Sequence, residues 1–298
     1  MFQSRTEEGN PINIPSSFNG YKIVDLIDTG SSSIIVLVEN QSTHERFAAK
    51  IIPKEYGIND NKIEYVNNEI KILKTLSHPN IVKYIDSFEI KNNDKEFIVL
   101  ITEYCEKGNL LSYIENENAL NENMKKKIIR ELLSGVQYLH EKGISHGDIK
   151  VENVLLNSDF TVKLCDFGFS RTLIVVGDDY KNGTLYYAAP ELFYKGYFNA
   201  LKADIYAIGI TIYSFFELQF PYKGENDEEI IKQIIKGQLT YSENMNDKLK
   251  KLIQQCTNMN PQLRPSIENI LNNEYLSIKL QPEKKIDVHR FEKVNNLF

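Results

Sequence analysis

Four polar side chains near the middle of the chain have the types and spacing needed for phosphate and metal chemistry. Residues 146–153 read HGDIKVEN, and DFG follows at 166–168. Asn153 and Asp166 offer the hard oxygen ligands that Mg²⁺ prefers and shares with phosphates. Asp148 can accept a hydroxyl proton, and Lys150 can meet a phosphoryl group. The spacing therefore predicts a site for metal-assisted phosphoryl chemistry.

A short hairpin is expected to position these groups. Residues 154–156 and 161–165 are apolar or alternating, as two short strands would be, and Asn-Ser-Asp at 157–159 supplies the turn. Asp148, Lys150 and Asn153 then stand at one mouth of the hairpin, and Asp166 stands at the other.

A lysine farther upstream lies in the middle of an apolar strand. Lys50 belongs to the predicted strand at 46–52, and a buried ammonium group needs a partner. Glu69 is the candidate, on a predicted helix at 64–76 whose apolar residues recur at helical spacing. Pro79 ends that helix, because a proline disfavours helical backbone in the residue before it. The alternative is that Lys50 lies on an exposed face.

Two further predicted strands, at 21–27 and 34–38, are joined by the small-residue turn DTGSSS at 28–33. Such a turn can lay backbone N–H groups against phosphates. Turns of this composition are also common in ordinary hairpins, so the turn alone does not identify a phosphate site.

Composition limits the classes of protein. The 298 residues are long for one core and sufficient for two lobes, and the net charge of −6 argues against nucleic-acid binding. No apolar run reaches the length of a membrane span, about 18 residues, and the first residues lack a signal core. Three widely spaced cysteines indicate a reducing compartment, which favours a cytoplasmic or nuclear location.

Taken together, the motifs resemble those of eukaryotic protein kinases. The shared elements, in order, are AxK around Lys50, the helical Glu69, HxDxKxxN at 146–153, DFG at 166–168, APE at 189–191 and DxxxxG at 204–209. The resemblance covers about residues 21–276. It implies an α+β, two-lobed protein kinase fold, with a small antiparallel β lobe carrying the αC helix at about 21–103 and a large, mainly α-helical lobe at about 109–276. Residues 1–20 are expected to be a flexible lead-in, and 277–298 a polar tail.

The resemblance also implies an activity and a set of roles. The protein would be a monomeric serine/threonine kinase that uses ATP and Mg²⁺ on protein substrates. Asp148 would deprotonate the acceptor hydroxyl, Lys150 would contact the γ-phosphate, and Lys50 paired with Glu69 would place the nucleotide. Asn153 and Asp166 would hold Mg²⁺. The implied nucleotide contacts are Ile27, Asp28, Gly30, Ser33, Ile35, Ala48, Lys50, Glu103, Cys105 and Leu155, with Thr102 as gatekeeper.

The resemblance to the APE segment also implies that Glu191 is buried against Arg264, in the stretch NPQLRP at 260–265. This segment and Arg264 argue against a small-molecule kinase of related fold. Residues 103–104 and the run DFGFS at 166–170 are similar to those of the calcium/calmodulin-dependent-kinase-like group.

Several positions depart from the family pattern. Asp28 and Ser33 replace two glycines of the phosphate loop, and Asp28 places a negative charge near an anionic ligand. A pseudokinase, a binding scaffold of the same fold, is therefore the alternative function. Gly147 stands where most regulated kinases carry an arginine that pairs with an activation-loop phosphate. This predicts activity without phosphorylation of the loop, where Tyr180 occupies the usual acceptor position. Tyr206 replaces a usual tryptophan.

Overall fold

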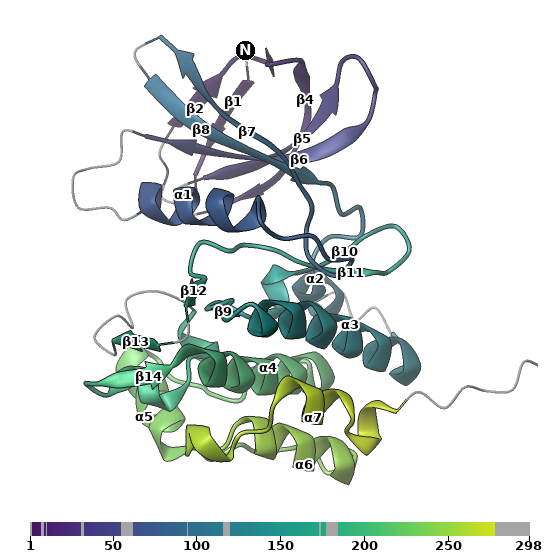
Figure 1. Ribbon diagram of the computed structural model, residues 1–298, viewed down its shortest axis with the longest axis vertical. Helices are drawn as coiled ribbons and strands as arrows, with labels where there is room; N and C mark the ends of the chain where they lie inside the picture. Colours follow the sequence, from purple (N-terminus) through teal and green to yellow (C-terminus); the bar gives the residue numbers. More distant parts are fainter. Residues whose placement is uncertain are drawn as a thin grey trace, which may run out of the picture.

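The computed structural model describes residues 2–6, 9, 11–30, 33–54, 62–93, 95–115, 120–172, 174–176 and 184–277. Strands and one helix, α1 (Lys62–Leu73), occupy one end of the molecule, and the remaining helices occupy the other end (Figure 1). The chain crosses from the first part to the second after residue 103, so the residues predicted to do chemistry come from both parts.

A six-stranded antiparallel sheet dominates the N-terminal part, in the order β3-β4-β5-β6-β8-β7. Its strands are β3 (Ser17–Phe18), β4 (Tyr21–Thr29), β5 (Ile34–Asn40), β6 (Arg46–Pro53), β7 (Tyr84–Asn92) and β8 (Lys95–Glu103). Alternation along β6 sends Lys50 and Ile52 to the face that α1 covers, where Ile52 packs with Val66. Ala49 and Ile51 point to the opposite face.

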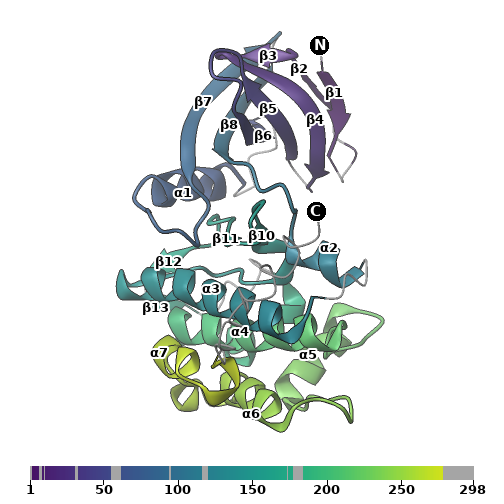
Figure 2. The ribbon, with the colours of Figure 1, turned by 90° about the vertical axis from the view of Figure 1, so that its right-hand side faces the viewer.

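The opposite face is covered by the first residues of the chain, which corrects the expectation of a flexible lead-in over residues 1–20. Strands β1 (Phe2–Arg5) and β2 (Pro11–Ile14) form a hairpin on the side of the sheet away from α1 (Figure 2). Ile12 and Ile14 are fully buried there among the apolar residues of the sheet. Burial of this apolar surface stabilises the hairpin despite its polar and turn-forming neighbours.

The C-terminal part is built from helices around the long, almost entirely buried α4 (Ala200–Glu217). The others are α2 (Leu110–Glu115), α3 (Glu122–Glu141), α5 (Asp227–Lys236), α6 (Asp247–Cys256) and α7 (Ile267–Leu271). An asparagine side chain caps α3, α4, α5 and α6 at the N-terminus, which satisfies N–H groups that lack a partner within the helix. Among the helices described, none combines the length and the apolar character needed to cross a membrane.

Short strands and turns between the two parts position residues 146–153, the predicted catalytic loop. The predicted hairpin forms from β10 (Val154–Leu156) and β11 (Val162–Leu164). The side chain of Asn157 accepts hydrogen bonds from the N–H groups of Asp159 and Thr161, which closes the predicted turn. Strand β9 (Ile144–Ser145) pairs with β12 (Arg171–Thr172), so the segment before the catalytic loop and the segment after DFG lie side by side. Farther along, β13 (Ile174–Val176) pairs with β14 (Tyr197–Asn199).

Candidate active site

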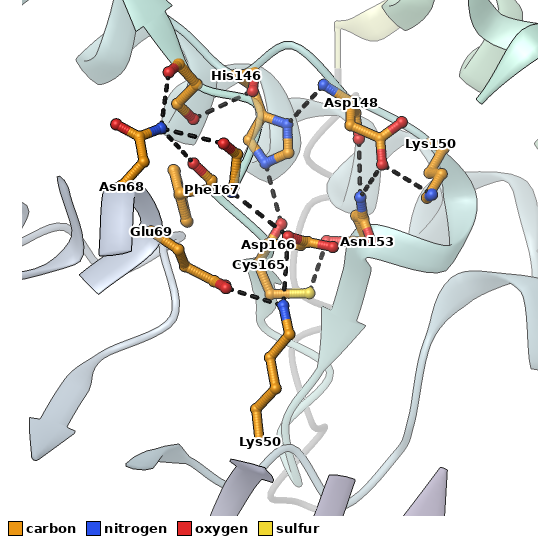
Figure 3. A network of polar contacts seen from close by, with 12 residues as sticks. Lys50, Asn68, Glu69, His146, Asp148, Lys150, Asn153, Cys165, Asp166 and Phe167 are labelled. Carbon is orange, nitrogen blue, oxygen red and sulfur yellow. Dashed lines mark hydrogen bonds and ion pairs between the residues drawn. The ribbon is translucent and has the colours of Figure 1, made fainter. Parts of the chain in front are cut away.

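The expected ion pair between strand β6 and helix α1 is present. The Nζ of Lys50 donates to Oε2 of Glu69 at 2.8 Å and lies 3.6 Å from Oδ1 of Asp166 (Figure 3). Burial alone would lower the pKa of Lys50, but the charges of Asp166 and Glu69 outweigh it and raise the pKa above its usual value. Lys50 therefore stays an ammonium group at neutral pH, ready for an anionic ligand.

A second cluster forms at the catalytic loop around Asp148, whose side chain is almost fully buried. Its Oδ2 lies 2.7 Å from the Nζ of Lys150 and accepts a hydrogen bond from the Nδ2 of Asn153 at 3.1 Å. Burial lowers the pKa of Lys150, but the charge and hydrogen bond of Asp148 outweigh it and raise the pKa. The carboxylate is thus held in place beside a permanent cation.

Thr184 joins this cluster from the far end of the segment that follows DFG. Its hydroxyl accepts a hydrogen bond from the Nζ of Lys150 at 2.7 Å and donates to Oδ1 of Asp148 at 3.1 Å. The backbone N–H of Thr184 also donates to that oxygen, at 3.2 Å. These contacts fix the end of the segment on the catalytic loop.

Asp204, on α4, anchors the catalytic loop through its carboxylate. Its carboxylate accepts hydrogen bonds from the N–H groups of His146 and Gly147, at 2.8 and 3.0 Å, and lies 2.9 Å from the Nε2 of His140. The His146 ring accepts from the N–H of Asp148 at its Nδ1 and therefore donates from Nε2 to the carbonyl of Cys165, 3.0 Å away. One buried helix residue thereby anchors the start of the loop, at His146 and Gly147.

Asn153 and Asp166 come from the two ends of the β10–β11 hairpin. The N–H of Cys165 donates to the carbonyl of Asn153 at 3.0 Å, which ties the two ends together. Burial raises the pKa of Asp166, but the nearby charges of Lys50 and Lys150 outweigh it and lower the pKa, so its carboxylate is ionised at neutral pH.

The oxygen donors of this pair fit Mg²⁺. The amide nitrogen of Asn153 is engaged with Asp148, so its amide oxygen remains as a donor beside the carboxylate of Asp166. Within the described ranges, no group of three or more His, Cys, Asp and Glu could hold a metal ion. A site of one carboxylate and one amide oxygen suits an ion that also takes ligands from phosphates.

A sequence model of the protein kinase domain matches residues 21–276. The chain belongs to the protein kinase family. One similar curated protein is the 3-phosphoinositide-dependent protein kinase B of Dictyostelium discoideum, 33% identical over 268 residues, which cover 88% of this chain. The kinase spans 29% of that relative's length, so the comparison concerns the catalytic domain and not the rest of the larger protein.

The predicted nucleotide contacts of the kinase gather on β4, β5, β6 and the segment after β8. Ile35 pairs with Asp28 on one side and with Lys50 on the other, and Ala48 pairs with Thr102. The N–H of Gly30 donates to the carbonyl of Ser33 at 2.8 Å and closes the turn, of which residues 31 and 32 lie outside the described residues. The structure brings this set to the neighbourhood of Lys50.

The predicted contacts on the other side of the nucleotide come from residues 103–105 and from β10. The Glu103 carboxylate accepts from the N–H of Lys83 and from the Nζ of Lys163, at 2.7 and 2.9 Å, and the backbone N–H of Glu103 donates to the carbonyl of Lys83 at 3.0 Å. These contacts fix the position of Glu103 beside β7 and β11. Burial raises the pKa of the Cys105 thiol to about 12. Leu155 pairs with Asn109 through an isolated bridge, which ties β10 to the segment that follows residue 103.

The expected buried pair of Glu191 and Arg264 in the kinase also forms. Arg264 donates from both terminal nitrogens to the two carboxylate oxygens of Glu191, at 2.6 and 2.7 Å. Its Nε donates to the carbonyl of Asn258 at 2.8 Å, and its guanidinium lies over the ring of Tyr206, 5.0 Å from the centroid. The tyrosine at the usual tryptophan position thus serves as a face for this cation.

Two residues at the active site were not predicted from the sequence. Asn68 and Tyr65, on α1, contact the turn that follows Asp166. Their side chains reach backbone and ring atoms about a hundred residues away, and no local pattern signals such contacts. The position of Asn68 directly before Glu69 is the sole hint that the sequence offers.

Proposed function

We propose that the protein is a serine/threonine protein kinase that uses ATP and Mg²⁺, in a two-lobed kinase fold. The observation that carries the proposal is the cluster of Asp148, Lys150 and Thr184, in which a buried carboxylate lies 2.7 Å from a lysine and 3.1 Å from a hydroxyl. A carboxylate held in this way can orient and deprotonate an alcohol, and the lysine can stabilise the charge of the transferred group.

The chain's own residues account for each requirement of phosphoryl transfer. Lys50, fixed by Glu69, binds phosphate oxygens, and Asp148 takes the proton of the acceptor hydroxyl. Asn153 and Asp166 would hold Mg²⁺, which would supply positive charge against the phosphates. Because this reaction depends mostly on positioning and electrostatic stabilisation, such a set is sufficient in type.

Thr184 supports an aliphatic hydroxyl as the acceptor. Its hydroxyl lies between Asp148 and Lys150, which supports a small alcohol as the group that these two side chains receive. The preference for serine and threonine over tyrosine therefore rests on the shape of this cluster. Membership of the calcium/calmodulin-dependent-kinase-like group, action as a monomer and a cytoplasmic or nuclear location stay predictions.

The pseudokinase alternative depends on Asp28. Its Oδ1 accepts a hydrogen bond from the N–H of Thr29 at 2.8 Å, so part of its charge is directed back to its own strand. This local hydrogen bond reduces the repulsion that Asp28 could exert on phosphates, which favours an active enzyme over a scaffold.

Transfer of labelled phosphate from ATP to a generic protein substrate tests the proposal. We expect incorporation into serine and threonine that requires Mg²⁺ and is lost in Asp148→Asn. Asp159→Asn makes the same change at an exposed position in the β10–β11 turn and should transfer normally. Nucleotide binding without any transfer would instead indicate the scaffold, and labelled tyrosine would contradict the serine/threonine assignment.

A further inference from the structure

The side chain of Asn68 faces the turn after Asp166 and meets three backbone carbonyls at once. Its Nδ2 lies 3.0 Å from the carbonyl oxygen of Ser170, 3.1 Å from that of Gly168 and 3.4 Å from that of Phe167 (Figure 3). We propose that Asn68 is a positioning residue, a clasp by which helix α1 holds the metal-binding Asp166 in place. The inference rests on the proposed function, because it assigns Asn68 a part in metal-dependent nucleotide binding.

The chemistry of the contact selects an amide. Three carbonyl oxygens present only acceptors, so the group that meets them must donate. The NH₂ of asparagine has two protons and can satisfy all three oxygens if one proton is shared. An aspartate of the same shape offers no proton and would be repelled. Among the described residues, no side chain other than that of Asn68 donates a hydrogen bond to the carbonyls of Gly168 and Ser170. No backbone N–H outside the helices and strands donates to them either.

The held segment starts from an unfavourable backbone conformation. Asp166 has a φ of +64°, in the left-handed region that residues other than glycine rarely adopt. Such a conformation persists only where the surrounding structure imposes it. The turn is closed by the N–H of Ser170 on the carbonyl of Phe167 at 3.1 Å, and the hydroxyl of Ser170 donates to the carbonyl of His146 at 3.1 Å. Asn68 adds hydrogen bonds to the same turn from helix α1.

A ring contact strengthens the same hold. Tyr65, one turn earlier on α1, lies with its ring 4.8 Å from that of Phe169. Helix α1 therefore touches the turn with two side chains, one polar and one aromatic. The next residue on the helix, Glu69, binds Lys50. One helix thus contacts both the lysine for the phosphates and the turn that carries the aspartate for the metal.

The experiment compares Asn68→Asp with Asn67→Asp. Asn67 is the exposed neighbour on the same helix, so the pair matches in residue type, charge change and helix position. ADP affinity is measured by calorimetry with and without Mg²⁺, and amide hydrogen exchange is followed over residues 166–170. In Asn68→Asp we expect metal-free ADP affinity within about twofold of wild type, a loss of about tenfold in the Mg²⁺-dependent gain, and faster exchange of the turn. Asn67→Asp should match wild type.

A merely structural role would lower stability without separating the two ADP affinities. If Asn68→Asp does not fold, Asn68→Ala carries the same test, because it removes the donors without adding charge. An Mg²⁺-dependent gain and an exchange rate equal to wild type in the Asn68 variant would overturn the proposal. The outcomes separate the proposed kinase activity from the positioning role of Asn68. If the wild type binds Mg·ADP but transfers no phosphate, the proposed function is wrong, whereas the role of Asn68 in Mg²⁺-dependent binding is unaffected. An equal loss of the Mg²⁺-dependent gain in Asn67→Asp would attribute the effect to helix charge and contradict the proposal.

Discussion

The kinase contains two buried ion pairs, one formed by a lysine and one by an arginine, and the two cations have different roles. Lys50 meets Glu69 through one contact of 2.8 Å, and its side chain keeps 24% of its surface exposed. Arg264 meets Glu191 through two parallel contacts and is fully buried, with further donors on backbone carbonyls. The first pair leaves a cation facing ligands, whereas the second uses its cation entirely within the protein.

The difference reflects the chemistry of the two side chains. A lysine ammonium is a compact charge on a flexible stem and can share itself between Glu69, Asp166 and a phosphate. An arginine guanidinium is a planar fork that fits a carboxylate and holds it in one orientation. The comparison therefore predicts that breaking the first pair removes activity, and breaking the second removes stability.

The largest effect is expected from Lys50→Met and from Asp166→Asn. Each removes a charge that acts on phosphate or metal, so phosphate transfer should fall by at least about 100-fold, as when a preorganised charge is deleted from other active sites. The circular dichroism spectrum should remain that of wild type. Turnover near the wild-type value in either variant would refute the assigned role.

The second pair is tested by Arg264→Met, which keeps the length of the side chain and removes the fork. Glu191 would then be left without its cation, which should lower the free energy of unfolding by about 3–5 kcal/mol. Denaturant unfolding measures the change. Arg46→Met, at an exposed position of β6, is the control and should shift stability little. An equal effect of both substitutions would contradict a special role for the buried pair.

Part of this architecture was predictable from the sequence because short-range sequence patterns specify it. Alternation and the turn at Asn157 predicted the β10–β11 hairpin, and a lysine inside an apolar strand demanded the partner found in Glu69. The N-terminal hairpin was not predictable, because the burial of Ile12 and Ile14 depends on a sheet face made by distant strands. Asn68 was missed for the same reason, since its acceptors lie about a hundred residues downstream.

The first pair also gives stability a dependence on pH, which the loss of Lys50 should enlarge. Burial raises the pKa of Glu69, and Lys50 opposes that rise. Without Lys50, the folded state should hold a proton on Glu69 more tightly than the unfolded state does. Stability of Lys50→Met should then be greatest below the ordinary glutamate pKa, about 4.5, and should fall as pH rises through the raised folded value.

Thermal unfolding of Lys50→Met, followed from the ordinary glutamate pKa up to neutral pH, measures this slope. The double variant Lys50→Met with Glu69→Gln has no carboxyl group at this position, so this pH dependence should be absent from it. A slope that persists in the double variant would assign the dependence to another group.

The smallest expected effect concerns residue 147. Most regulated kinases carry an arginine at this position, whereas this kinase has Gly147. Its φ is +84°, and a Cβ there would clash with the carbonyl oxygen of Phe169, so the loop conformation itself requires glycine. The protein therefore has no arginine at this position to pair with a phosphate on the loop. Asn68 holds the turn after Asp166 through hydrogen bonds between uncharged groups. Tyr180, the candidate acceptor, lies outside the described residues.

Activity should accordingly be indifferent to phosphorylation of the loop. Phosphatase treatment, or Tyr180→Phe, should leave the rate of phosphate transfer within about twofold, whereas a tenfold loss, about 1.4 kcal/mol, would show a phosphate that the enzyme needs. Gly147→Arg sharpens the test. If the position simply lacked its usual cation, arginine would make activity respond to phosphatase. Because the backbone conformation and Phe169 exclude a side chain, we expect Gly147→Arg to lower activity whether or not the protein has been dephosphorylated.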